Sequence, residues 1–144
     1  MRRMKKIVWM VLGLALSVLL CGGASASSAF VDDGIYAAYS GIVRKNFTDY
    51  SPECSYDEET NLYSVHLVMS GVAETSYPMR SRLEETWTNV REQQRALSET
   101  CYTGLKDLGY DVNCMVTVVD NSGTAPVAMI ICYNGNVIYD FMAE

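Results

Sequence analysis

The chain has few of the residues that most catalytic and metal sites use. It contains a single histidine, His66, and neither a G-x-S-x-G nor an H-E-x-x-H motif. The sequence therefore lacks the signatures of the common serine hydrolases and zinc proteases. No two of its cysteines are spaced as C-x-x-C, and with one histidine this argues against a structural zinc site. We expect no metal and no cofactor.

Basic residues are also scarce, and four of them stand at the very start of the chain. There are 11 Lys+Arg against 17 Asp+Glu, and the first six residues hold Arg2, Arg3, Lys5 and Lys6. Removing this start leaves 7 Lys+Arg against all 17 Asp+Glu, a net charge of −10. Such a surface repels phosphate backbones, and no basic stripe offsets the repulsion. We therefore expect no nucleic acid among the partners.

The first 26 residues have the organisation of a secretory signal peptide. The basic start is followed by an apolar run, Ile7 to Leu20, and by the small residues Ala24-Ser25-Ala26. Cleavage after Ala26 would leave residues 27–144 as a single exported domain with no membrane span. The run is shorter than the roughly 20 residues of a spanning helix, although an uncleaved anchor stays open as an alternative. A third alternative is a lipid anchor on Cys21, which would keep the protein at the cell surface.

Export changes how the cysteines are interpreted. Without Cys21, the chain keeps Cys54, Cys101, Cys114 and Cys132, and an even count in an oxidising compartment predicts two disulfides. Helix and strand lengths place Cys101 over Cys114, which favours Cys101–Cys114 and leaves Cys54–Cys132. The rival is Cys54–Cys101 with Cys114–Cys132, because a hairpin centred on Gly123 puts 114 and 132 opposite each other. The third pairing and free thiols also stay open.

The first half of the chain predicts a helix, a hairpin and a long helix. Apolar residues at helical spacing indicate a helix over 29–46, in which two glycines weaken the pattern. Residues 52–56 and 62–71 resemble two strands around the polar turn 57–61, the second alternating in polarity. An apolar stripe then indicates a helix from Pro78 or Ser81 to Leu108, with Gly109 as its stop.

Three more strands complete the predicted fold. Residues 112–119 alternate in polarity, 126–133 form an almost continuous apolar strand typical of burial on both faces, and 136–142 return after Asn134-Gly135. Asn-Gly is the favoured dipeptide of a type I′ turn. The order α-β-β-α-β-β-β predicts an α+β fold: an antiparallel sheet of about five strands with the long helix on one face. The first helix either joins the long helix there or covers part of the other face.

The second face of this sheet is the candidate functional surface. It is predicted to carry a half-apolar set of side chains: His66, Val68, Met115, Thr117, Val119 and Ile138. A face of this kind is either covered by another element or used for contact. The leading hypothesis is an exported, disulfide-stabilised, non-catalytic interaction domain that binds a protein, a peptide or a small ligand, or pairs with itself as a homodimer. The alternatives are a lipoprotein tethered through Cys21 and a hydrolase-type enzyme that uses His66 as its base.

Overall fold

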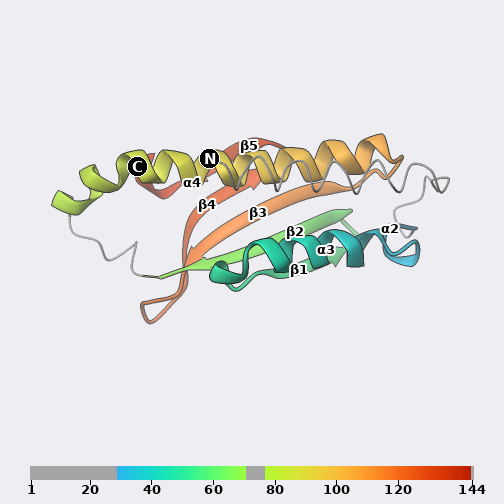
Figure 1. Ribbon diagram of the computed structural model, residues 1–144, viewed down its shortest axis with the longest axis horizontal. Coiled ribbons are helices and arrows are strands. Elements are labelled where there is room, and N and C mark those ends of the chain that lie inside the picture. The colour runs from blue at the N-terminus through green and yellow to red at the C-terminus, as the bar shows by residue number, and fades with distance from the viewer. Residues whose placement is uncertain (1–28, 71–76, 144) are drawn as a thin grey trace.

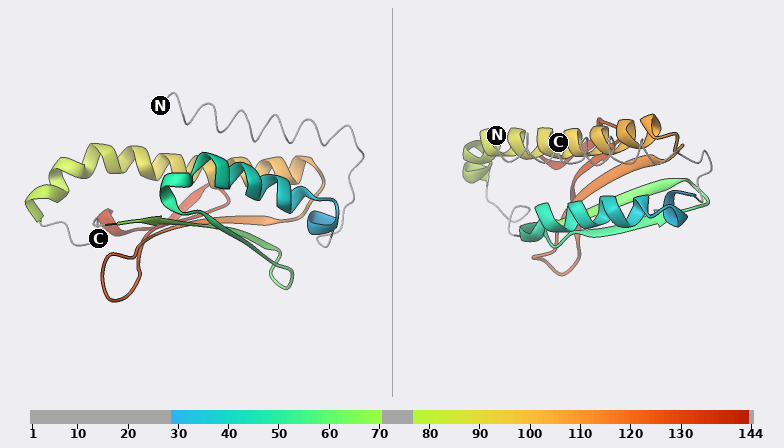
Figure 2. Two further views of the ribbon diagram at one scale, coloured as in Figure 1. Left: turned by 60° about the horizontal axis from the view of Figure 1, so that its bottom comes forward. Right: turned by 45° about the vertical axis from the view of Figure 1, so that its right-hand side comes forward.

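A five-stranded sheet carries the described helices on one of its faces (Figure 1 and Figure 2). The computed structural model describes residues 29–70 and 77–143, with only the backbone described for 77–83. The strands lie side by side in chain order. They are β1 (Glu53–Asp57), β2 (Leu62–Met69), β3 (Asn113–Asp120), β4 (Val127–Tyr133) and β5 (Asn136–Asp140). The predicted α+β class and the five strands are confirmed, whereas the predicted signal segment 1–26 lies outside the described residues.

One pair of neighbouring strands is parallel, so the prediction of a wholly antiparallel sheet is wrong. β2 and β3 run in the same direction, while the other three neighbouring pairs are antiparallel. The cause is the connection between them, which contains the long helix α4 (Tyr77–Asp107). A helix that runs back along the sheet returns the chain to the end of the sheet where β2 begins, and the next strand then runs parallel to β2. Short connections join the antiparallel pairs, the longest being the loop 121–126 between β3 and β4.

The helix α4 agrees closely with its predicted span and packs on the sheet through one stripe. Trp87, Leu97, Cys101 and Leu105 recur at steps of four or at a sum of three- and four-residue steps, and all four are buried. The helix ends where Gly109 adopts a positive φ of 89°. There the Gly109 and Tyr110 N–H groups donate to the carbonyls of Lys106 and Leu105, at 3.0 and 2.9 Å. This is a Schellman ending, and it turns the chain toward β3.

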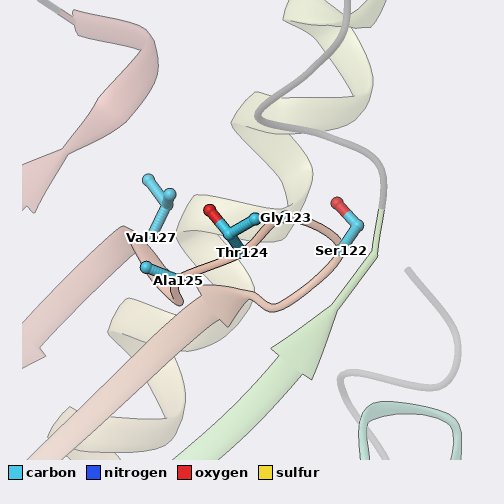
Figure 3. A pocket seen from close by; sticks show the side chains of 5 residues that line it. All are labelled: Ser122, Gly123, Thr124, Ala125 and Val127. Carbon is cyan, nitrogen blue, oxygen red and sulfur yellow. The ribbon is translucent and has the colours of Figure 1, made fainter.

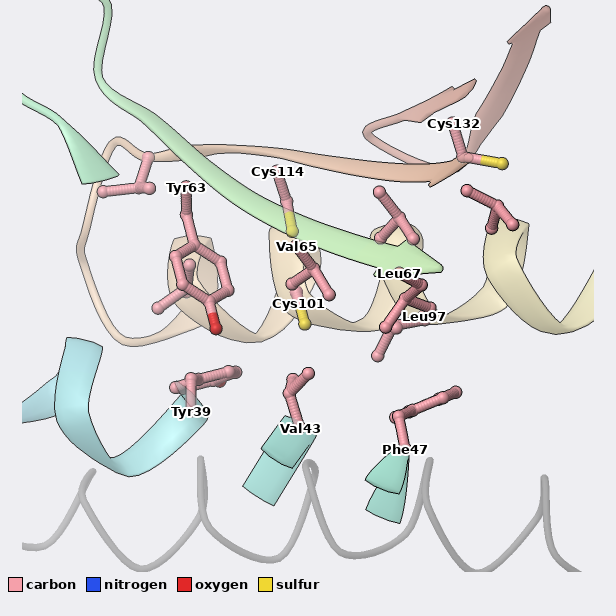
Figure 4. Close-up of a cluster of buried hydrophobic side chains, with 14 of the residues drawn as sticks. Tyr39, Val43, Phe47, Tyr63, Val65, Leu67, Leu97, Cys101, Cys114 and Cys132 are labelled. Atoms are coloured by element: carbon pink, nitrogen blue, oxygen red, sulfur yellow. The ribbon is translucent and has the colours of Figure 1, made fainter. Parts of the chain in front are cut away.

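The predicted first helix is split in two and lies beside α4. Gly34, with φ 76°, separates α2 (Ala29–Asp32) from α3 (Ile35–Asn46). Figure 4 shows Tyr39, Val43 and Phe47 directed from this side toward the core face of β2. Both helices therefore share one face of the sheet and enclose one core, and α3 does not cover the opposite face (Figure 2).

Two short 3-10 helices occur among the described residues, η1 (Thr48–Tyr50) and η2 (Phe141–Ala143). The second replaces the end of the strand that the sequence predicts over 136–142, so β5 stops at Asp140. The backbone of Met142 folds back there and donates to the Asp140 carboxylate at 2.9 Å. This hydrogen bond favours the turn over further extension.

The turn between β4 and β5 confirms the type I′ prediction and docks on α4. Asn134 and Gly135 both have positive φ, 48° and 86°. The Gly135 N–H donates to the Ser98 hydroxyl on α4 at 3.0 Å. A Cβ on Gly135 would lie 2.9 Å from the Cβ of Glu99, so this turn can approach the helix only because the residue has no side chain.

We expect Gly135→Ala to lower the free energy of unfolding by about 2 kcal/mol, since it adds left-handed strain and a contact with helix α4. The matched control is Gly41→Ala, at a position inside α3 where an added Cβ meets nothing within 4 Å. This change should stabilise by about 0.5–1 kcal/mol, because alanine is the better helix former. Urea unfolding of both variants measures the difference, and equal effects would contradict the described packing of the turn.

Candidate functional site: the open face of the sheet

The face of the sheet that points away from α3 and α4 is the candidate functional site, and we call it the open face. Side chains alternate between the two faces along each strand. In β2, Tyr63, Val65 and Leu67 point into the core and are at most 1% exposed, whereas Ser64 and His66 between them are half-buried. Within the described residues, no helix covers the side chains on the open face (Figure 2).

Strand register defines the rows of this face. Thr117 of β3 lies at its centre, paired with His66 on one side and with Ile131 on the other. The complete central row, from β1 to β5, is Glu53, His66, Thr117, Ile131 and Tyr139. The next row, from β1 to β4, is Ser55, Ser64, Met115 and Tyr133.

The predicted contact residues take different places in this arrangement. The face brings together four half-buried side chains, namely His66, Val68, Met115 and Thr117. Val119 lies across from Val68 but is only 7% exposed, so it adds little surface. Ile138 is 61% exposed and has no partner position, because the register shifts at this point of β5.

Sequence reasoning missed five residues of this face: Glu53, Ser55, Ile131, Tyr133 and Tyr139. The two in β1 depend on the exact hairpin register: a turn over 57–61 would set Glu53 opposite Val65, whereas the observed pairing of Asp57 with Leu62 sets it opposite His66. The two in β4 were missed because the apolar run 126–133 was interpreted as buried on both faces. That interpretation is wrong: Ile131 and Tyr133 are half-buried beside fully buried Ile130 and Cys132.

A shallow hollow of about 320 Å³ lies at the β1–β3 side of the open face. Its polar side chains include His66, Glu53 and Ser64, the residue types of an acid–base–nucleophile set. Nucleophilic catalysis needs these groups in hydrogen-bond contact. Among the described residues, no hydrogen bond joins the His66 side chain to either partner. The arrangement is a polar recess next to the apolar centre of the face, without an assembled triad.

A second hollow, of about 630 Å³, lies in the bend of the loop between β3 and β4 (Figure 3). Its lining consists of small residues: Ser122, Gly123, Thr124, Ala125 and Val127. The Asp120 carboxylate holds the start of the loop by accepting from the Ser122 backbone N–H at 2.9 Å and from its hydroxyl at 2.6 Å. No side chain in the lining is charged, so this hollow offers no acid or base for catalysis.

The four cysteines predicted to form bridges lie on the core side of the sheet as free thiols. Cys54 and Cys132 belong to one row with Val65 and Val116 between them, about 14 Å apart at the usual strand spacing. A disulfide needs Cα atoms within about 7 Å, so this register does not support Cys54–Cys132. The expected opposition of 114 and 132 is also not found, since Cys132 lies across from Val116.

No cluster of three or more His, Cys, Asp or Glu side chains that could bind a metal ion occurs within residues 29–70 and 84–143. In the described ranges no helix combines the length and the apolar character that crossing a membrane requires. Comparison with known proteins finds no matching family model, no matching curated protein and no matching solved structure.

Proposed function

We propose that the protein is an exported, non-catalytic binding domain whose contact surface is the open face of the sheet. One observation carries the proposal: α3 and α4 pack on the same face, so no described helix covers the half-apolar set of side chains on the other face. A sheet face of this composition is typical of a surface that contacts another molecule. The signal-like segment 1–26 supports export, and a lipid anchor on Cys21 would keep the same domain at the cell surface.

The composition of the open face favours a protein or peptide as the partner. Its centre, around Met115, Ile131 and Tyr133, carries no formal charge. Interface centres are depleted in charged residues and enriched in methionine and aromatic residues, with polar residues at the rim. The rim here is acidic at the β1 side, where Glu53 and the exposed turn residues Asp57, Glu58 and Glu59 lie. The matching partner has an apolar centre and basic residues along one edge.

Site-specific photo-crosslinking in the native host tests this function. The benzophenone amino acid is placed at Thr117, at the centre of the open face, and in a control at Thr88, exposed on α4. Crosslinks to a second protein from position 117 and none from position 88 are the expected result. Adducts from position 88 alone would contradict the proposal. Adducts of twice the chain mass from position 117 would show that the partner is a second copy of this chain and not a different protein.

Export has its own readout in the same cells. Intact mass spectrometry of the exported fraction is expected to find a chain that begins at Ser27. A lipidated chain that begins at Cys21 would show that the protein is tethered to the cell surface and not secreted. A full-length chain confined to the cytosol would contradict export.

The recess that groups His66 with Ser64 and Glu53 favours one second candidate, a hydrolase-type enzyme with His66 as its base. Its test is the His66→Ala variant in any reaction found for the exported chain. Loss of the reaction with unchanged folding would support this candidate, and full retention would end it.

A further inference from the structure

Among the described cysteines, Cys101 and Cys114 face each other between α4 and β3. Cys101 lies on the buried stripe of α4 and Cys114 on the core face of β3, and both are 0% exposed. Figure 4 shows the two sulfur atoms directed into the same part of the core. Burial raises the pKa of Cys114 well above its ordinary value, and the neighbouring Cys101 thiol raises it further.

Cys54 and Cys132 have other neighbours. The Cys54 thiol lies near the hydroxyl of Tyr63, the residue diagonal to it on β2. Cys132 lies on the same face, nearer the β5 edge of the sheet, close to the charged groups of Arg95, Glu92 and Asp140. Burial is the main reason why the pKa of Cys132 rises to about 11.

The strand register places Cys132 diagonal to Cys114, so a disulfide between these two residues does not fit. Asn134, not Cys132, lies across from Cys114: its N–H donates to the Cys114 carbonyl at 2.9 Å, and its side chain accepts from the Cys114 N–H at 2.8 Å. Diagonal neighbours in a sheet are about 7–8 Å apart, beyond the Cβ separation of a disulfide. The register thus disfavours Cys54–Cys132 and Cys114–Cys132, and Cys101–Cys114 is the pair whose sulfur atoms point into the same part of the core.

We infer that Cys101 and Cys114 are oxidised to a single disulfide that ties α4 to β3, and that Cys54 and Cys132 remain thiols. The inference depends on the proposed export, because reducing compartments keep thiols reduced. The two thiols lose two protons and two electrons as the S–S bond forms. A disulfide-containing oxidant, either a small-molecule disulfide or a thiol-oxidase protein, takes up the electrons and is reduced to two thiols.

The buried position of the pair determines when the bridge forms and how it resists reduction. Thiolates perform disulfide exchange, and burial in the finished core disfavours them at Cys114. The exchange therefore takes place before α4 closes over β3. Once the protein is folded, both sulfur atoms are shielded from external reductants.

Peptide mapping under non-reducing conditions tests the pairing in two preparations of the full chain. One is the exported fraction of the native host, and the other is purified protein that is reduced, unfolded and refolded in a glutathione redox buffer. The expected product in both is a Cys101–Cys114 peptide pair, with Cys54 and Cys132 alkylated. A bridge in the refolded protein but not in the host fraction would contradict export and leave the pairing intact. Absence of the bridge after refolding would overturn the pairing.

Serine variants supply the matched controls. Cys101→Ser should abolish the mapped bridge without creating another, whereas Cys54→Ser and Cys132→Ser should leave the Cys101–Cys114 peptide unchanged. In the native protein, iodoacetamide should modify half-exposed Cys54 and leave buried Cys132 unmodified until the chain is unfolded. A mapped bridge that contains Cys54 or Cys132 in the wild-type chain would refute the single-bridge assignment.

Discussion

Asp140→Ala is expected to lower the free energy of unfolding by about 3 kcal/mol. The Asp140 carboxylate is 7% exposed and accepts from the Trp87 indole N–H at 2.8 Å and from the Arg91 guanidinium at 2.9 Å. It also accepts from the Met142 backbone N–H, so one side chain ties the C-terminal end of the sheet to α4. Its removal leaves a buried indole donor and a guanidinium without their acceptor, the costly way to break a buried polar contact.

A surface ion pair on the same helix is the control for Asp140→Ala. Arg95 pairs with Glu92 and Glu99, whose side chains are 48% and 51% exposed. Exposed pairs of this kind contribute about 0–1 kcal/mol, so Glu92→Ala should change stability little. Chemical denaturation compares the two variants. Equal losses would mean that the Asp140 contacts do not hold the C-terminal strand to α4.

The stabilisation from Asp140 should depend on pH with a defined sign. Burial alone raises the pKa of Asp140, but hydrogen bonds from Trp87, Arg91 and Met142 outweigh it and hold that pKa below its ordinary value. A carboxylate with a lowered pKa in the folded state stabilises the protein fully above its unfolded pKa, about 3.9. The contribution is lost as pH falls through the lower folded pKa. Asp140→Asn should therefore flatten the acid side of the stability profile, and an unchanged profile would contradict this role.

Leu67→Ala is expected to cost about 3 kcal/mol, whereas Val68→Ala should cost about 1 kcal/mol or less. Leu67 is 0% exposed in the core that β2 shares with both helices, close to Leu97 and Phe47 (Figure 4). Truncation there leaves a cavity that rigid neighbours on three elements cannot fill. Val68 follows directly in the chain but points to the open face and is half-buried.

This pair of substitutions separates the two faces of one strand. Urea unfolding of the two variants gives both free energies under the same conditions. Similar losses at the two positions would indicate that a second layer packs on the open face, which would contradict its availability for binding.

Local patterns predict most elements of this fold because each leaves a short-range signal. Alternation along β2, the apolar stripe of α4 and the Asn134-Gly135 turn all depend on residues a few positions apart, and all three appear as predicted. The direction of β3 relative to β2 depends instead on which strands become neighbours after α4. No local pattern encodes that choice, so the parallel pair was missed.

The candidate site could be predicted in part, for the same reason. Alternation within β2 and β3 identifies His66, Met115 and Thr117, which the register does bring together. Ile131 and Tyr133 lie in an apolar run without alternation, so their exposure to the open face follows only from the placement of α3. The pairing of cysteines depends on register across four strands, and a two-residue shift there removes the expected opposition of Cys114 and Cys132.

Methionine oxidation tests the availability of the open face most directly. Met115 is half-buried on the open face, whereas Met129 of the neighbouring strand is 0% exposed. The folded protein, diluted until light scattering shows a monomer, is treated with hydrogen peroxide and sulfoxide formation is followed by peptide mass spectrometry. An open face predicts that Met115 is oxidised several times faster than Met129. Equal protection of both residues in the monomer would show that the face is covered and would contradict its proposed role in binding.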